Sequence, residues 1–170
     1  MFKITTERPE HADAIEMLLD TAFGVERRKK ISYSYRVGIE KLTPLCLVAL
    51  TEGELAATIR YWPIAIETSP SLLLGPIAVA ESHRNAGLGA MLIRRSLDRA
   101  ATLGYRSAVL VGDEPYYSRF GFYPASRHGI VMPNENPARV LVLPLPPNRG
   151  TLPSGLIGPW RSVRRPACAA

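Results

Sequence analysis

The stretch IAVAESHRNAGLGA, residues 77–90, contains the turn on which the prediction of fold and function depends. Its apolar start reads as the end of a strand, its middle as a polar turn, and Arg84-Asn-Ala-Gly-Leu-Gly89 as the opening of a helix. The first amides of a helix have no partner within the helix, and together with the helix dipole they attract phosphate. Gly87 and Gly89 carry no side chain that would block a close approach, and Arg84 can add a charged hydrogen bond. The stretch therefore predicts an anion site at a helix N-terminus.

Two other phosphate-binding motifs that use such a turn need residues that this chain lacks. A P-loop needs Gly-Lys-Ser/Thr after four spacer residues, and that pattern is absent. A dinucleotide-binding fingerprint needs a third glycine where the chain has Leu92. A tight turn that merely starts a helix stays open on this stretch alone.

The flanking sequence supplies the other elements of one domain. Apolar runs predict strands at 45–50, 55–66, 72–79, 108–111 and 140–143, of which the first two form a hairpin. Helical spacing predicts helices at 9–23, 26–38, 87–103 and 114–120. Pro63 within a strand implies an edge, a bulge or a break.

One β-α-β unit, residues 72–111, lies within an otherwise antiparallel order. This order predicts an α+β (α/β) fold with a mixed, mostly antiparallel sheet flanked by helices on both faces. We expect one domain at 1–147, with its binding motif at 72–124, and a basic Pro/Arg-rich tail at 148–170.

Composition excludes several classes of protein. Hydrophobic residues make up 46% and charged residues 21%, which is the balance of a globular protein rather than a disordered one. No apolar run approaches the ~20 residues that span a bilayer, so no membrane is expected. The N-terminus is polar within four residues, unlike a signal peptide, so we expect a cytoplasmic protein. Cys46 and Cys168 have no partner at metal-ligand spacing, so no metal is expected.

The net charge of +6 lies mostly at one end of the chain. No acidic residue follows Glu135, and the excess there comes from arginines. This distribution argues against nucleic acid as a partner, although a polyanion-binding tail is an alternative to a solvated end. The arginines are Arg139, Arg149, Arg161, Arg164 and Arg165.

Two motifs resemble those of the GNAT acetyltransferases. Arg84-x-x-Gly87-x-Gly89 is similar to the R/Q-x-x-G-x-G/A signature of that family, and residues 75–79 resemble the strand that leads into it. Downstream, Tyr117-x-x-x-Gly121-Phe122 resembles a second pattern of the family. The string Gly-Asp-x-x-Tyr-Tyr-x-x-Phe-Gly-Phe, residues 112–122, is similar to one branch of it.

The resemblance implies a GNAT-type fold that uses acetyl-CoA as co-substrate, without a metal. The turn amides would hold the pyrophosphate of CoA, and the preceding strand would pair with the pantetheine arm. One amide of that strand would also polarise the acetyl carbonyl. The implied strand residues are Ile77, Ala78 and Val79, and the implied turn residues are Arg84, Asn85, Ala86, Gly87, Leu88, Gly89 and Ala90.

By the same resemblance the activity is N-acetyl transfer to a primary amine, with Tyr117 as the acid that protonates the leaving thiolate. A phenol with a pKa of ~10 suits that role at neutral pH. Tyr116 is the adjacent rival, and helical spacing implies that only one of the two faces the thioester. Leu73 stands where some relatives carry a catalytic carboxylate, which leaves the base open. Nearby candidates for the base are Glu67, Glu81, His83 and Asp113.

The acceptor is a small-molecule or protein amine whose identity no motif carries. We expect it to enter opposite the CoA, against a wall of aromatic residues and one arginine. A non-catalytic acyl-CoA-binding sensor or interaction module is the alternative function, and a homodimer stays open. The residues of the expected wall are Tyr33, Tyr35, Arg36, Tyr61, Trp62 and Phe122.

Overall fold

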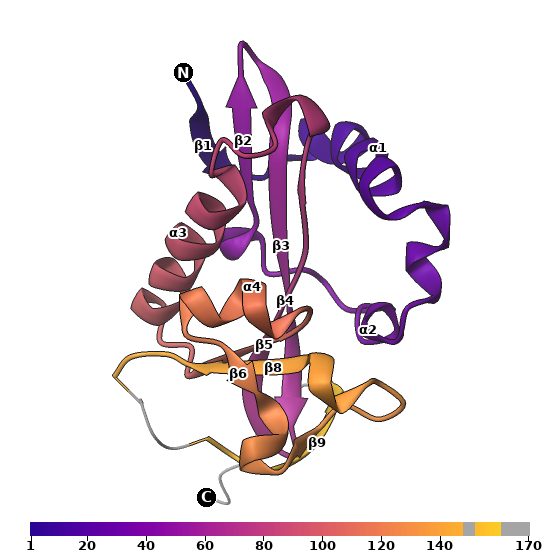
Figure 1. Ribbon diagram of the computed structural model, residues 1–170, viewed down its shortest axis with the longest axis vertical. Helices are drawn as coiled ribbons and strands as arrows, with labels where there is room; N and C mark the ends of the chain where they lie inside the picture. Colours follow the sequence, from indigo (N-terminus) through magenta and orange to yellow (C-terminus); the bar gives the residue numbers. More distant parts are fainter. Residues whose placement is uncertain (148–151, 161–170) are drawn as a thin grey trace, which may run out of the picture.

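The computed structural model describes residues 1–147 and 152–160 and confirms the mixed, mostly antiparallel sheet with helices on both faces (Figure 1). The strands pair in the order β1-β2-β3-β4-β5-β8-β6, and β9 pairs with β3 and β7. β4 and β5 are parallel, as are β7 and β9, and the other pairs are antiparallel. The strands are β1 (Lys3–Thr6), β2 (Leu47–Thr51), β3 (Glu54–Ile66), β4 (Ser69–Val79), β5 (Ser107–Val111), β6 (Tyr123–Pro124), β7 (Ile130–Val131), β8 (Val140–Pro144) and β9 (Gly155–Pro159).

Helices α1 and α3 cover opposite faces of the sheet (Figure 1). Successive side chains of a strand point to opposite faces, and β2 shows the consequence. Leu47 packs in the cluster that contains the buried side of α3, whereas Val48 packs against α1. The sheet is thus buried on both sides, which explains why its central strands read as continuous apolar runs. The helices are α1 (Ala12–Phe23), α2 (Ile31–Ser34), α3 (Leu88–Thr102) and α4 (Glu114–Tyr117).

A β-bulge in β4 opens the middle of the sheet. The register between β3 and β4 shifts so that Gly75 and Pro76 together lie opposite Arg60 alone. Gly75 has a φ of +120°, a conformation that favours glycine. Parallel pairing between β4 and β5 is confined to residues 72–73 and 108–109, so the two strands separate beyond the bulge.

Pro63 lies where β3 changes partners. β3 pairs with β2 over residues 54–59 and with β9 over residues 64–66 on the same edge. Pro63 falls between these two stretches, where its missing N–H breaks no ladder hydrogen bond on that edge. The sequence-based expectation of an irregular edge at this proline is confirmed.

The predicted helix at 26–38 is wrong. The chain forms a short 3-10 turn at Val25–Lys29 and a single helical turn, α2, separated by an extended Lys30. Arg27, the first residue of the basic run 27–30, turns inward and is 3% exposed. Its guanidinium bonds Asp20 of α1, and this tertiary contact overrides the helical spacing.

The short strands β1, β6, β7 and β9 were not predicted from the sequence. They have two to five residues and no clear alternation, and they form because an existing strand edge offers them a partner. β9 lies within the stretch 148–170 that was expected to be a tail. Outside the described residues lie Arg149, Arg161, Arg164, Arg165 and Cys168.

Candidate active site

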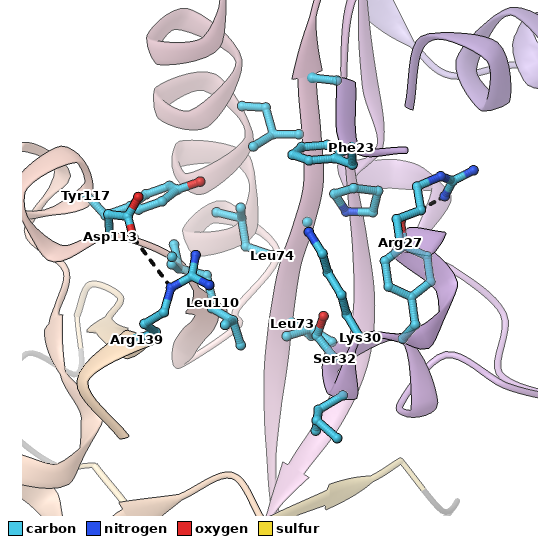
Figure 2. A pocket seen from close by; sticks show the side chains of 18 of the residues that line it. Phe23, Arg27, Lys30, Ser32, Leu73, Leu74, Leu110, Asp113, Tyr117 and Arg139 are labelled. Atoms are coloured by element: carbon cyan, nitrogen blue, oxygen red, sulfur yellow. Dashed lines mark hydrogen bonds and ion pairs between the residues drawn. The ribbon is translucent and has the colours of Figure 1, made fainter. Parts of the chain in front are cut away.

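A cavity of about 610 Å³ lies where β4 and β5 separate (Figure 2). One wall is β4 from residue 73 to 79, and another is the segment 110–117 that joins β5 to α4. The segment 23–36, which begins at the last residue of α1, forms the third wall, and Glu135 and Arg139 also line the cavity. Figure 2 shows Tyr117 and Arg27 on opposite sides of the central strands, with Phe23 and Lys30 between them in this view.

The predicted strand residues Ile77, Ala78 and Val79 all line this cavity. Their backbone pairs with residues 57–59 of β3 on one edge. The other edge has left β5 and faces the cavity. A strand edge of this kind offers amide and carbonyl groups to an extended ligand, which would add to the sheet as another strand does.

The N-terminus of α3 lies at one end of the cavity. The first turn of α3 closes with a 3.0 Å hydrogen bond from Met91 N to Gly87 O, so the amides of residues 88–90 precede it. No side chain among the described residues caps this end of the helix. Gly89 itself lines the cavity. A Cβ on Gly89 would lie 3.3 Å from Tyr116 Oη and 3.6 Å from a methyl of Val79, so glycine keeps this passage open.

The remaining turn residues lie around this helix end but do not line the cavity: Arg84, Asn85, Ala86, Gly87, Leu88 and Ala90. The Leu88 side chain belongs to the core, at 1% exposure, so only its backbone is available to a ligand. Arg84 is exposed and lies 4.0 Å from Glu81, a loose pair that leaves the guanidinium free to turn toward an anion. Gly87 has a φ of +76°, which favours glycine at the start of α3.

Tyr117 points from α4 into the cavity, toward β4 (Figure 2). Its ring packs edge-on against Phe122, with centroids 6.1 Å apart. The ring also lies against the backbone of Gly112, where a Cβ would be 2.9 Å from Cδ2 of Tyr117 and closer still to Cε2. Burial raises the pKa of Tyr117 to about 12, so its phenol is protonated at neutral pH.

Tyr116 lines the same cavity as Tyr117. That only one of the two faces the thioester stays a prediction. The two rings meet edge to face at 4.9 Å, which lets adjacent residues share one wall. Tyr116 is 40% exposed, its hydroxyl lies next to Gly89, and the Arg119 guanidinium stacks 4.2 Å from its ring. Tyr116 therefore borders the helix end, whereas Tyr117 lies deeper, against Gly112.

Two carboxylates of the described residues line the cavity, those of Asp113 and Glu135. Asp113 lies 3.4 Å from Arg139 Nε, and this ion pair is drawn in Figure 2. Glu135 was not singled out from the sequence, because it lies in a polar loop that resembles any other surface turn. The other candidates for a base lie elsewhere: Glu67 accepts a 2.7 Å hydrogen bond from Leu156 N, and Glu81 and His83 do not line the cavity.

Only part of the expected acceptor wall lines the cavity, and its role in binding the acceptor stays a prediction. Tyr33 and Arg36 line the cavity, but Tyr61 and Phe122 are core residues at 0% and 1% exposure. Tyr35 and Trp62 pack in the cluster beneath the wall. Sequence spacing identifies these aromatic residues but does not say which side of the sheet each one faces.

A network of ion pairs fixes the third wall to the sheet. Arg27 bonds Glu16 and Asp20 of α1, and Arg60 of β3 bonds Glu7 and the same Glu16. Burial would raise the pKa of Glu16, but the hydrogen bonds from Arg60 and Arg27 outweigh it and lower that pKa to about 2. The arginines are matched by carboxylates, and the segment after α1 is held in place.

The described residues include no group of three or more His, Cys, Asp or Glu side chains that could hold a metal ion. Within the same part of the chain, no helix has the length and apolar character needed to cross a membrane.

Comparison with known proteins identifies one family. The model of the acetyltransferase (GNAT) family matches residues 12–122, which is more than half of the chain. The chain is 32% identical over 130 residues to the uncharacterized N-acetyltransferase YhbS of Escherichia coli strain K12, covering 75% of this chain and 77% of the relative. It is 26% identical over 125 residues to the uncharacterized N-acetyltransferase YjhQ of the same strain, covering 71% and 68%.

Two solved structures are similar along nearly the whole chain. The crystal structure of E. coli YhbS in complex with CoA has a TM-score of 0.79 at 27% identity, covering 92% of this chain and 88% of that one. The GNAT family acetyltransferase from Brucella melitensis in complex with acetyl-CoA has a TM-score of 0.70 at 26% identity, covering 95% and 97%.

Proposed function

Because the chain belongs to the GNAT acetyltransferase family, we propose that it transfers the acetyl group of acetyl-CoA to a primary amine by direct attack of that amine on the thioester. The acceptor amine belongs to a small molecule or a protein. The observation that carries the proposal is the continuous path from the open edge of β4 to the uncapped N-terminus of α3, with the Tyr117 phenol facing it. The complexes of two similar proteins with CoA and acetyl-CoA support the choice of co-substrate.

The residues present fit acetyl-CoA. The amides of Leu88, Gly89 and Ala90 would bind its pyrophosphate, with Arg84 adding a charged contact. The backbone of residues 77–79 would bind the pantetheine arm, and one amide of that edge would donate to the acetyl carbonyl oxygen. Acetyl-CoA supplies the activated acetyl group as a thioester.

Tyr117 is the proposed acid. Its hydroxyl makes no hydrogen bond to another described residue, and burial keeps its proton in place at neutral pH. In this role Tyr117 donates its proton to the sulfur as the thiolate leaves. Tyr116 would instead contact the ligand beside Gly89, where its hydroxyl lies.

The amine must be neutral to attack, so a group in the cavity has to take a proton from it. Asp113 is held by Arg139, whereas Glu135 has no ion pair among the described residues. Glu135 is therefore our proposed acceptor of this proton, directly or through water.

Calorimetric titration with acetyl-CoA, and with NADH as the control, tests the proposed co-substrate. We expect one acetyl-CoA to bind per chain and NADH not to bind. Failure of acetyl-CoA to bind at millimolar concentration would mean that the turn at 84–89 only starts a helix.

Release of CoA in the presence of a panel of amines then separates an enzyme from the alternative, a non-catalytic acyl-CoA-binding sensor or interaction module. The enzyme hypothesis is supported if acetyl transfer to at least one amine occurs and if Tyr117→Phe slows that transfer ~100-fold or more without a matching loss of acetyl-CoA affinity. Tight binding without transfer to any amine supports the sensor.

A further inference from the structure

Arg36 lies in the cavity wall without a counterion among the residues that the structure describes. Its Nε and Nη1 are buried and have no hydrogen-bond partner within the described ranges 1–147 and 152–160. Its guanidinium carbon lies 4.0 Å from the centroid of the Tyr33 ring and 4.9 Å from that of Trp62. The two rings fix the position of the guanidinium but offer it no negative charge.

Arg27 and Arg60, the two arginines that are buried in the described part of the chain, differ from Arg36 in having partners. Arg27 is paired with two carboxylates, and so is Arg60. A buried charge without a partner is unfavourable, so an arginine left in this state within a cavity indicates a ligand that completes it. Burial lowers the pKa of Arg36 to about 10, and the side chain is still charged at neutral pH.

The position of Arg36 decides which reactant supplies the anion. Its Nη2 lies 3.9 Å from the place of a Cβ on Gly75, in the bulge of β4. Gly89, at the end of α3, instead neighbours Val79. Val79 lies four positions after Gly75 along the strand, which is about 13 Å at ~3.3 Å per residue. A pyrophosphate bound at α3 therefore lies too far away to reach Arg36, and the anion belongs to the acceptor.

We propose that Arg36 binds the carboxylate of an acceptor that carries an amine and a carboxylate in one small molecule, as an amino acid does. This inference rests on the proposed function, because it assigns the acceptor of that reaction. A flat guanidinium between two aromatic rings suits a flat carboxylate, to which it presents its N–H groups edge-on. Lys30 lines the same wall, 5.0 Å from the Phe23 ring and without a carboxylate partner in the described part of the chain, and adds positive charge.

Binding is tested first without turnover. The chain has two tryptophans, so Trp160→Phe leaves Trp62, which stacks on Arg36, as the only one. Glycine, β-alanine and 4-aminobutyrate are titrated against this variant, each beside its carboxamide. We expect saturable changes in Trp62 fluorescence with at least one acid, and none with its amide.

Arg36→Met should abolish that response, whereas Arg139→Gln, which removes a cavity arginine already paired with Asp113, should preserve it. Arg36→Lys keeps the positive charge but loses the paired N–H groups of the guanidinium, so we expect it to bind the acid about tenfold more weakly. This variant replaces Arg36→Met in the test if Arg36→Met fails to fold. The carboxylate site would be overturned by equal responses to acid and amide, or by a response to inorganic phosphate alone. It would also be overturned if no acid gave a response, or if the response were unchanged in the folded Arg36→Met protein.

Turnover supplies the second readout. We expect kcat/KM with acetyl-CoA to be at least tenfold higher for the acid than for its amide, and Arg36→Met to lower it ten- to hundred-fold for the acid alone. Without a carboxylate site, the amide should be the better acceptor, because its amine is less basic than that of the acid and a larger fraction of it is neutral at pH 8. Failure of acetyl-CoA to bind would overturn the proposed function, while the fluorescence titration would still decide the carboxylate site.

Discussion

Gly112→Ala should inactivate the enzyme by moving Tyr117 and should leave binding of acetyl-CoA intact. A Cβ at residue 112 would lie 2.9 Å from Cδ2 of the Tyr117 ring, closer to Cε2, and 3.1 Å from Cδ1 of Leu110. The backbone there cannot simply retreat, because Gly112 N donates a 2.9 Å hydrogen bond to Arg139 O. Since carbon atoms prefer separations of ~3.5–4.0 Å, the ring has to move by about 1 Å.

The size of the effect follows from this displacement. A misplacement of about 1 Å in a catalytic group lowers turnover on the order of 100-fold. Loss of a general acid lowers it by about 10²–10⁴-fold, so Tyr117→Phe sets the limit. Overpacking destabilises a core by ~1–3 kcal/mol, so we expect the melting temperature of Gly112→Ala to fall by several degrees while the protein still folds.

The assay is kcat at saturating acetyl-CoA for Gly112→Ala, Tyr117→Phe and the double variant, with acetyl-CoA affinity measured calorimetrically. If the methyl acts through Tyr117, the double variant should be no slower than Tyr117→Phe alone. Gly158→Ala is the matched control, because a Cβ there meets nothing within 4 Å. Wild-type kcat in Gly112→Ala, or a double variant whose loss is the product of the two single losses, would refute the reasoning.

Three further predictions concern the cofactor passage, acid stability and the pH profile. Gly89→Val should weaken acetyl-CoA binding at least tenfold by calorimetry, since even one Cβ would lie 3.3 Å from Tyr116 Oη; unchanged affinity would count against the passage. The pKa of Glu16 is lowered from 4.5 to about 2, so the stability that its ion pairs contribute is complete above pH 4.5 and lost as pH falls toward 2. The urea midpoint should fall over that range, less steeply in Glu16→Gln, and equal slopes would contradict this. Because the pKa of Tyr117 is raised to about 12, its proton is present below that pH, and kcat should show no loss from phenol ionisation near pH 10. A loss near pH 10 that Tyr117→Phe removes would contradict the raised pKa.

The helices and strands that the sequence pattern predicted are those whose local conformational preference agrees with the way they pack in the fold. The long helix α3 and strands β2 to β5 have strong apolar periodicity, and the structure places them within a few residues of the predicted bounds. The segment after α1 departs from its helical pattern because Arg27 bonds residues of α1 instead of facing water. Strand β9 pairs with β3 only because the fold leaves that part of the edge open.

The candidate site likewise contains residues that local sequence features predicted and contacts that only the tertiary structure shows. A glycine turn and a helix start are local features, so sequence alone was enough to predict an anion site at Gly89, which lines the cavity. The resemblance to the family singled out residues 77–79 and Tyr117, and these also line the cavity. It did not predict that Gly112 leaves room for the tyrosine ring, since that contact depends on how α4 folds back on β5.

What the sequence by itself determined is therefore the backbone anion site: an open turn followed by a helix whose first amides have no partners within it. The tertiary structure decided which side chains meet around that anion site. The bulge at Gly75 separates β4 from β5, and segments far apart along the chain, carrying Arg36, Tyr117 and Glu135, close around the gap. Spacing along a chain cannot specify this arrangement, because it depends on how strands and loops pack in three dimensions.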